Sequence, residues 1–271
     1  MSDIVLTAGV RSNLLNLQQT ASLMNTVQNQ LATGKKVNSA LDNPISYFTS
    51  QSLTNRANSL NALLDSMSNA FQTIQAANNG ISSITKLVQS AQALVSQAQQ
   101  TSDTAVRSSL STQFNAVLTQ IDQLAGDAGF NGINLLNGDD LTVTLNESGT
   151  SSVTVSGVTD TTSGDLSIGN ATGNWAASSD LTTASGDLTA ALTTLQSQAQ
   201  SFGTNLSTVQ IRQDFTKAMV NTLQTGSDNL TLADSNEAGA DLLALQTRQQ
   251  LSTTALSLAS QASQAVLRLF Q

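Results

Sequence analysis

The chain contains no cysteine and no histidine among its 271 residues. Without cysteine it can form neither disulfides nor a thiol nucleophile. Without histidine it lacks the commonest general base and the commonest transition-metal ligand. Proline occurs only once, as Pro44, and aromatic residues make up 3%. These absences argue against an ordinary enzyme, and we expect no catalytic residues, no cofactor and no metal.

Charged residues are also scarce, at 10%, and they leave a net charge of −8. An acidic chain is repelled by phosphate backbones and anionic headgroups, so we expect neither nucleic acid nor a membrane as a partner. The first residues, Met1 to Leu6, contain no basic cluster and no long apolar run. We therefore expect no cleaved signal peptide and no membrane span, and export from the cell would need another route.

What the sequence does contain is a long apolar repeat between residues 53 and 98. Positions spaced alternately by three and four residues are apolar there, and only Arg56 breaks the series. Such a repeat keeps one seam of a helix against a partner helix. We expect the partner to be a returning helix between residues 188 and 223, so that the seam closes within the chain. The predicted seam residues are Leu60, Met67, Ile74, Ile81 and Val88.

Helical periodicity also covers residues 4–33, 104–126, about 180–225 and 235–271, with an interruption expected at 226–233. Between these helices the apolar period changes to two, at residues 141–145 and 153–155, which predicts a small β-hairpin. Residues 157–180 are rich in Ser, Thr and Gly, and we expect a surface region with weak strands at most. The predicted fold is mainly α: a long antiparallel coiled coil or helical bundle built from both termini, with a hairpin in the middle.

The terminal helices carry apolar stripes that are wider than one seam. Pairing the two ends with each other would cover only part of these stripes, so we expect the remainder to contact other copies of the chain. The residues predicted to pack between subunits are Leu14, Leu17, Met24, Leu31, Leu251, Leu258 and Leu269.

Three sequence motifs together resemble bacterial flagellin. Residues 31–44 read LATGKKVNSALDNP, which is similar to the helix–turn block of that family. Residues 130–136 read FNGINLL, and the chain closes with a run from Asp241 to Phe270 that resembles the family's terminal coiled-coil strand. Each motif alone is weak, but the three occur in the family's order. The resemblance covers residues 1–138 and 185–271.

The resemblance implies a structural subunit that polymerises into the flagellar filament, the helical propeller for swimming or swarming. It implies that residues 1–35 and 236–271 form an inner-tube coiled coil, that 36–138 and 181–235 form an outer helical layer, and that 139–180 form a small β and loop surface region. It also implies export unfolded through the flagellar secretion channel to the cell exterior. The implied partners are other copies of the chain, hook-associated and cap proteins, and the export machinery with its chaperone.

Other functions remain open from the sequence. A hook–filament junction protein shares flagellin-like termini and would differ in its middle segment. An enzyme could use Asp139 and Asp140, or Asp42, as metal ligands or as acid and base. Adjacent carboxylates after an Asn-Gly pair are more often a solvated turn, so we expect no catalysis. A secreted coiled-coil adhesin is a third alternative, which no sequence feature favours.

Overall fold

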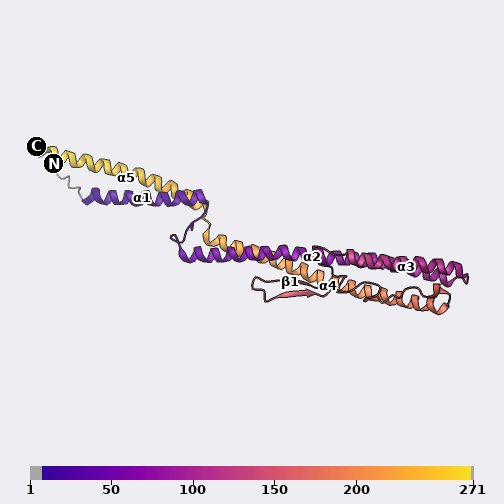
Figure 1. Cartoon of the computed structure of the whole chain (residues 1–271). Coiled ribbons are helices and arrows are strands. Elements are labelled where there is room, and N and C mark those ends of the chain that lie inside the picture. Colours follow the sequence, from indigo (N-terminus) through magenta and orange to yellow (C-terminus); the bar gives the residue numbers. More distant parts are fainter. Residues whose placement is uncertain (1–7, 270–271) are drawn as a thin grey trace. The chain divides into compact units, whose positions relative to one another are not determined.

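Five α-helices dominate the chain, of which a computed structural model describes residues 8–269 and the side chains of 9–262, 264 and 265. The helices are α1 (Ala8–Thr33), α2 (Pro44–Gln99), α3 (Thr104–Asp127), α4 (Ser178–Thr231) and α5 (Ser235–Leu269). Two strands, β1 (Leu141–Thr144) and β2 (Ser152–Val155), and a 3-10 turn, η1 (Gly173–Trp175), lie between α3 and α4 (Figure 1). This confirms the predicted fold class.

Polar side chains set the starts of the helices. The Asn43 side chain accepts a hydrogen bond from the Ser46 N–H (3.0 Å), so Asn43 rather than Asp42 caps α2. Pro44 follows as the first helical residue, where its missing N–H costs nothing. Asp103 and Asp234 cap α3 and α5 in the same way, each accepting from two backbone N–H groups at 2.8–3.3 Å.

The chain divides into two compact units. The first, which we call the terminal unit, comprises residues 1–55 and 222–271, and the second, the central unit, comprises residues 56–221. These boundaries fall inside α2 and α4, whereas the inner-tube boundaries expected at positions 35 and 236 lie nearer the two ends of the chain. The expected three-part division concerns layers of an assembly and remains a prediction.

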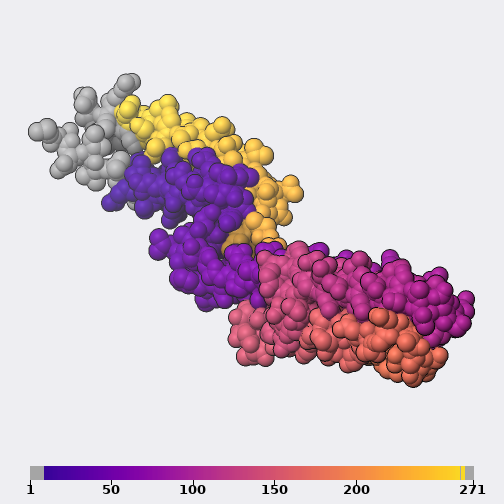
Figure 2. Space-filling view, turned by 45° about the vertical axis from the view of Figure 1, so that its right-hand side comes forward, coloured from indigo at the N-terminus to yellow at the C-terminus, as the bar shows by residue number. Residues whose placement is uncertain are grey.

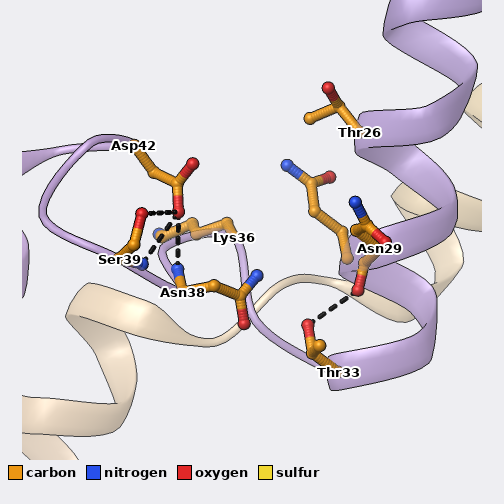
Figure 3. Close-up of a pocket in the computed structure, with 8 residues that line it drawn as sticks. Thr26, Asn29, Thr33, Lys36, Asn38, Ser39 and Asp42 are labelled. Atoms are coloured by element: carbon orange, nitrogen blue, oxygen red, sulfur yellow. Dashed lines mark hydrogen bonds between the residues drawn. The ribbon is translucent and has the colours of Figure 1, made fainter.

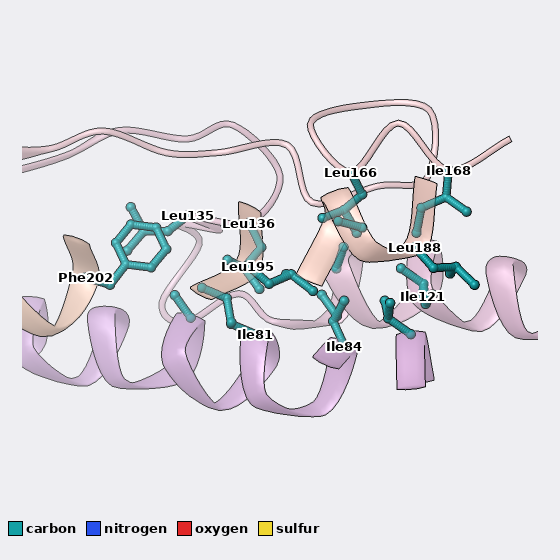
Figure 4. Close-up of a cluster of buried hydrophobic side chains, with 14 of the residues drawn as sticks. Ile81, Ile84, Ile121, Leu135, Leu136, Leu166, Ile168, Leu188, Leu195 and Phe202 are labelled. Carbon is teal, nitrogen blue, oxygen red and sulfur yellow. The ribbon is translucent and has the colours of Figure 1, made fainter. Parts of the chain in front are cut away.

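The hydrophobic core lies in the central unit. It runs along α2, α3 and α4 and contains buried residues from Met67 to Val209. Figure 4 shows part of it, where Ile81 and Ile84 of α2 lie against Leu195 of α4, and Phe202 of α4 lies beside Leu135. The five residues predicted for the seam in α2 are at most 5% exposed. A stripe of this length removes a large apolar area from water, which is the dominant favourable term in folding.

The hairpin covers part of this core. β1 and β2 pair antiparallel, with Leu141 opposite Val155 and Val143 opposite Val153. Leu141, Val143 and Val155 are buried, while the threonines between them lie on the outer face. The alternation predicted from the sequence is therefore the alternation of a sheet with one buried face.

Residues 157–180 were expected to be a surface region with weak strands at most. The structure has no strand there and most of these residues are at least partly exposed, but residues 157–177, which we call the strap, also bury apolar side chains against the helices. Leu166, Ile168 and Trp175 of the strap are at most 4% exposed, and the Trp175 ring lies 5.0 Å from the Phe114 ring of α3. The strap forms no regular strand: its backbone is bound partly by the backbone of residues 135–138, partly by its own carbonyls and partly by helix side chains. The Asp122 carboxylate, for example, accepts hydrogen bonds from the Thr162 N–H (2.6 Å) and hydroxyl (3.0 Å).

The interruption expected at residues 226–233 is also corrected, because α4 continues to Thr231. Tertiary contacts offset the low helix propensity of Gly226. A Cβ at Gly226 would meet Leu53 of α2 at an ordinary 3.5 Å, and the next residue, Ser227, is buried. The Ser227 hydroxyl lies within hydrogen-bond distance of the Ser50 hydroxyl (2.7 Å) and the Thr54 hydroxyl (3.0 Å).

Candidate assembly surface of the terminal helices

Helices α1 and α5 of the terminal unit lie side by side over most of their lengths (Figures 1 and 2). They run antiparallel, because the end of α1 meets the start of α5 through a hydrogen bond from the Ala233 N–H to the Gly34 carbonyl (3.0 Å). Further along, Asn16 and Thr20 lie beside Arg248 and Ser252 around a small polar hollow of about 270 Å³. The expectation that the two ends of the chain pair is therefore met within one subunit.

This helix pair buries little apolar surface. In α1 only Thr20 and Val27 are buried, and the Thr20 hydroxyl donates to its own helix, to the Asn16 carbonyl (2.8 Å). Of the described side chains of α5 only Ala238 is buried, whereas Leu242, Leu245 and Leu256 are half-buried. A two-helix seam of this kind leaves most of each helix surface in water, so it contributes little to stability alone.

The terminal unit instead exposes its large apolar side chains. Among the described residues, eleven of the fifteen exposed large apolar side chains belong to it. They are Leu14, Leu15, Leu23, Leu31, Leu41, Ile45, Phe48, Leu232, Leu243, Leu251 and Leu258. We call this set the terminal apolar surface. Exposed apolar residues at this density indicate a protein–protein contact surface.

The predicted intersubunit residues fall into three groups. Leu251 and Leu258 are 67% and 62% exposed, and Leu14 and Leu31 are exposed to a smaller degree. Leu17 and Met24 are half-buried, on the side of α1 that contains Thr20. The Leu269 side chain lies outside the described residues. Whether these residues contact another subunit stays a prediction.

Sequence reasoning missed part of the terminal apolar surface. Leu41, Ile45 and Phe48 are 95%, 79% and 62% exposed, at the end of the loop after α1 and the start of α2. Their spacing of four and three residues places them on one side of the chain if the helical path is extended back to Leu41. That spacing was a usable signal, but the polar loop residues around Leu41 obscured it.

The loop between α1 and α2 is fixed by hydrogen bonds to the end of α4. The Lys36 and Val37 N–H groups both donate to the Thr231 carbonyl, at 2.8 and 3.3 Å. The Lys36 ammonium donates to the Asn229 carbonyl (3.3 Å). Asn229 belongs to the last turn of α4, so the Lys36 charge lies at the negative end of the α4 dipole.

Within the same loop Asp42 closes a tight turn. Its carboxylate accepts hydrogen bonds from the Asn38 and Ser39 N–H groups, both at 2.9 Å, beside an open polar hollow of about 360 Å³ (Figure 3). These bonds, that of Asn38 first, lower the pKa of Asp42. The turn keeps Leu41 on the outside of the loop.

The other carboxylates considered for chemistry also hold turns. Asp139 accepts from the Asn134 N–H (2.8 Å) and Asp140 from the Gly157 N–H (2.9 Å). Within residues 8–269 no three acidic side chains gather into a group that could hold a metal ion. In the same part of the chain no helix is long and apolar enough to cross a membrane.

Comparison with known proteins identifies the family of the chain. Residues 7–140 match the bacterial flagellin N-terminal helical region, and residues 186–270 match the bacterial flagellin C-terminal helical region. Flagellin FljO of Caulobacter vibrioides is 32% identical over 100% of this chain and 99% of its own length. A flagellin of Brucella melitensis is 29% identical, with all of both chains covered. The crystal structure of Bacillus cereus flagellin is similar over 55% of this chain and 86% of its own, at 21% identity and a TM-score of 0.48.

The two helical regions matched are the two ends that build α1 to α3 and most of α4 and α5. The full-length matches are named as flagellins, so the junction-protein alternative is not favoured. The chain thus belongs to the bacterial flagellin family and is a structural subunit of the flagellar filament.

Proposed function

We propose that the terminal apolar surface is the principal contact through which this flagellin polymerises, and that other copies of the chain cover it. The observation that supports this proposal is the contrast between the two units. The central unit contains the extended hydrophobic core, whereas the described part of the terminal unit buries only four apolar side chains: Val27, Val37, Leu223 and Ala238. A surface that one subunit leaves in water is available to the next.

In this proposal the terminal helices form the inner tube of the filament, residues 1–35 with 236–271, through Leu14, Leu17, Met24, Leu31, Leu251, Leu258 and Leu269. Residues 36–138 and 181–235 form the outer layer, and 139–180 cover its outer side. The absence of basic residues between Arg107 and Arg212 supports an acidic, solvated outer side. Hook-associated and cap proteins, and an export machinery with its chaperone that secretes the chain, complete the proposed partners.

Replacing Leu258 with Asp tests the contact directly. Leu258 is 62% exposed, so the charge does not have to enter a core when the monomer folds. In the polymer the same carboxylate would be buried against apolar groups, at a cost of several kcal/mol, on the order of 3–5. We expect Leu258→Asp to leave the monomer's circular dichroism unchanged and to abolish filament formation in sedimentation and negative-stain microscopy.

The matched control is Ser257→Asp, which adds the same charge one residue away on another exposed face of α5. We expect this variant to polymerise. Normal polymerisation of Leu258→Asp would show that the outward leucines of α5 do not lie in the subunit contact.

A further inference from the structure

The strap is bound to the central unit by acceptors on two helices. Besides Asp122 of α3, the Asn115 side chain of α3 accepts from the Ala171 N–H (2.9 Å) and Asp187 of α4 from the Gly169 N–H (3.4 Å). Each of these acceptors faces a backbone donor. The strap thus satisfies its N–H groups partly through these helix side chains and partly through backbone carbonyls, such as that of Leu135, which accepts from the Val158 N–H (2.7 Å).

Asp160 is the exception in this segment. Its side chain is 0% exposed, and neither carboxylate oxygen accepts a hydrogen bond from any described residue. Its backbone is held in place, because the Asp160 N–H donates to the Leu136 carbonyl (2.9 Å). A buried carboxylate without a donor costs several kcal/mol in most proteins, so the charged form is poorly accommodated here.

The polar side chain next to Asp160 is Gln198 of α4, and its Oε1 atom is also buried without a partner. An ionised carboxylate and an amide oxygen are both acceptors, so the ionised Asp160 can interact favourably only with the Gln198 amide nitrogen and leaves Oε1 unsatisfied. A proton on the carboxyl group removes the conflict, because the carboxylic acid can donate to Gln198 Oε1. One proton would then satisfy two buried atoms at once.

The electrostatic surroundings act in the same direction. Burial raises the pKa of Asp160 to about 6, the Gln198 amide opposes the shift and the negative charge of Asp165 adds to it. Of the elements against Asp160, α4 contributes Gln198, the strap contributes Asp165, and the segment before β1 contributes the backbone of Leu136. No basic group acts on Asp160 from the described residues.

We propose that Asp160 and Gln198 form a proton-binding site under the strap, and that binding of this proton fastens the strap to α4. The docked strap then binds a proton that the undocked strap releases. A group whose pKa is higher in the folded state contributes stability below its unfolded pKa and loses that contribution as the pH rises through the folded pKa. For Asp160 the loss falls between about pH 4 and pH 6, from its ordinary value of 3.8 to its raised value of about 6.

The test is urea unfolding of the monomeric full-length chain, followed by the fluorescence of Trp175, at pH 5 and pH 7.5. Trp175 is the only tryptophan of the sequence and lies in the strap, so it reports undocking. From the raised pKa, Asp160 should make the unfolding constant of the strap about tenfold smaller at pH 5 than at pH 7.5. We expect Asp160→Asn to remove this tenfold component and to be more stable than the unaltered protein at pH 7.5, because its amide donates to Gln198 Oε1.

Asp187→Asn is the matched control, because it also removes a carboxylate at the contact between the strap and α4. In the control, the unfolding constant of the strap should still be about tenfold smaller at pH 5 than at pH 7.5. An Asp160→Asn variant with the pH dependence of the unaltered protein would overturn the proposal. Carbon-13 NMR of the unaltered protein, labelled at Asp carboxyl carbons, gives an independent reading without mutation. We expect one carboxyl to titrate near pH 6, and titration of every carboxyl below pH 5 would likewise overturn the proposal.

Discussion

Gly80 shows how a single residue positions two parts of the central unit. It lies buried in the middle of α2, where a Cβ would come within 2.6 Å of Leu136 Cδ1 and 2.9 Å of Ala128 Cβ. Helix α2 continues through Gly80 without interruption. The lack of a side chain at Gly80 lets the segment after α3 pack directly onto the backbone of α2.

We therefore predict that Gly80→Ala destabilises the central unit. Alanine is the better helix former by about 1 kcal/mol, but overpacking a tight contact costs about 1–3 kcal/mol. The Leu136 methyl group can move aside, whereas Ala128 has no freedom to do so. We expect a net loss of up to about 2 kcal/mol in the free energy of unfolding, measured by urea denaturation.

Gly203→Ala in α4 is the control, because a Cβ there would meet no atom within 4 Å. It should stabilise the protein by about 0.5–1 kcal/mol. Stabilisation by both substitutions would show that the contact at Gly80 relaxes without cost.

Arg56 marks what the sequence can and cannot reveal about single residues. The sequence showed Arg56 as the one break in the apolar series of α2, but it did not show why an arginine occupies that position. In the structure its guanidinium forms an ion pair with Glu147, in the turn of the hairpin. The two residues are 91 positions apart. No local pattern connects such positions, so only the folded chain could reveal the pair.

At the scale of elements, the strap changes an expectation about deletion. A Ser- and Thr-rich surface segment should be removable, and on that reading deletion of residues 158–176 would leave filaments intact. Because Leu166, Ile168 and Trp175 are buried, the deletion would instead expose apolar groups on α3 and α4, including Phe114. We now predict that it lowers the stability of the central unit by at least about 3 kcal/mol, since truncating one large buried aromatic alone costs this much.

Circular dichroism with urea denaturation measures this loss. Deleting residues 148–150, in the exposed turn of the hairpin, is the control and should have a small effect. An unchanged unfolding midpoint for the strap deletion would restore the original view of the segment as a dispensable surface.

The helices were predictable because their signal is local. The spacing of three and four residues along α2, and the caps at Asp103 and Asp234, depend on residues within a turn or two of one another. The strap was not predictable, because its hydrogen bonds join residues 40 and 56 positions apart, as from Thr162 to Asp122 and from Ala171 to Asn115. Its composition resembles that of a loop, and its burial comes from the helices beneath it.

At the scale of the whole molecule, apolar groups are distributed unequally between the two units. The core lies entirely in residues 67–209, and most exposed large apolar side chains lie outside that range. The sequence predicted an excess of apolar surface at the two ends, since the stripes of the terminal helices are wider than one seam. It could not show which side chains remain exposed. Leu14 and Leu17 are both leucines of α1, and only the packing of α1 against α5 leaves Leu14 exposed and Leu17 half-buried.

The same distribution predicts two levels of stability in the monomer. Segments with few buried apolar contacts open at low free-energy cost, whereas core helices open only with the whole domain. The α1–α5 pair should therefore open frequently in the monomer, and assembly should suppress this opening by covering the terminal apolar surface.

Amide hydrogen exchange on the monomer and on the filament tests this account most directly. In the monomer we expect residues 8–33 and 245–265 to exchange rapidly and residues 60–98 to be strongly protected. In the filament both sets should be protected, because neighbouring subunits cover the terminal helices. Protection of residues 8–33 and 245–265 in the monomer equal to that of residues 60–98 would contradict the account, since it would show that the terminal unit is stable without any neighbour.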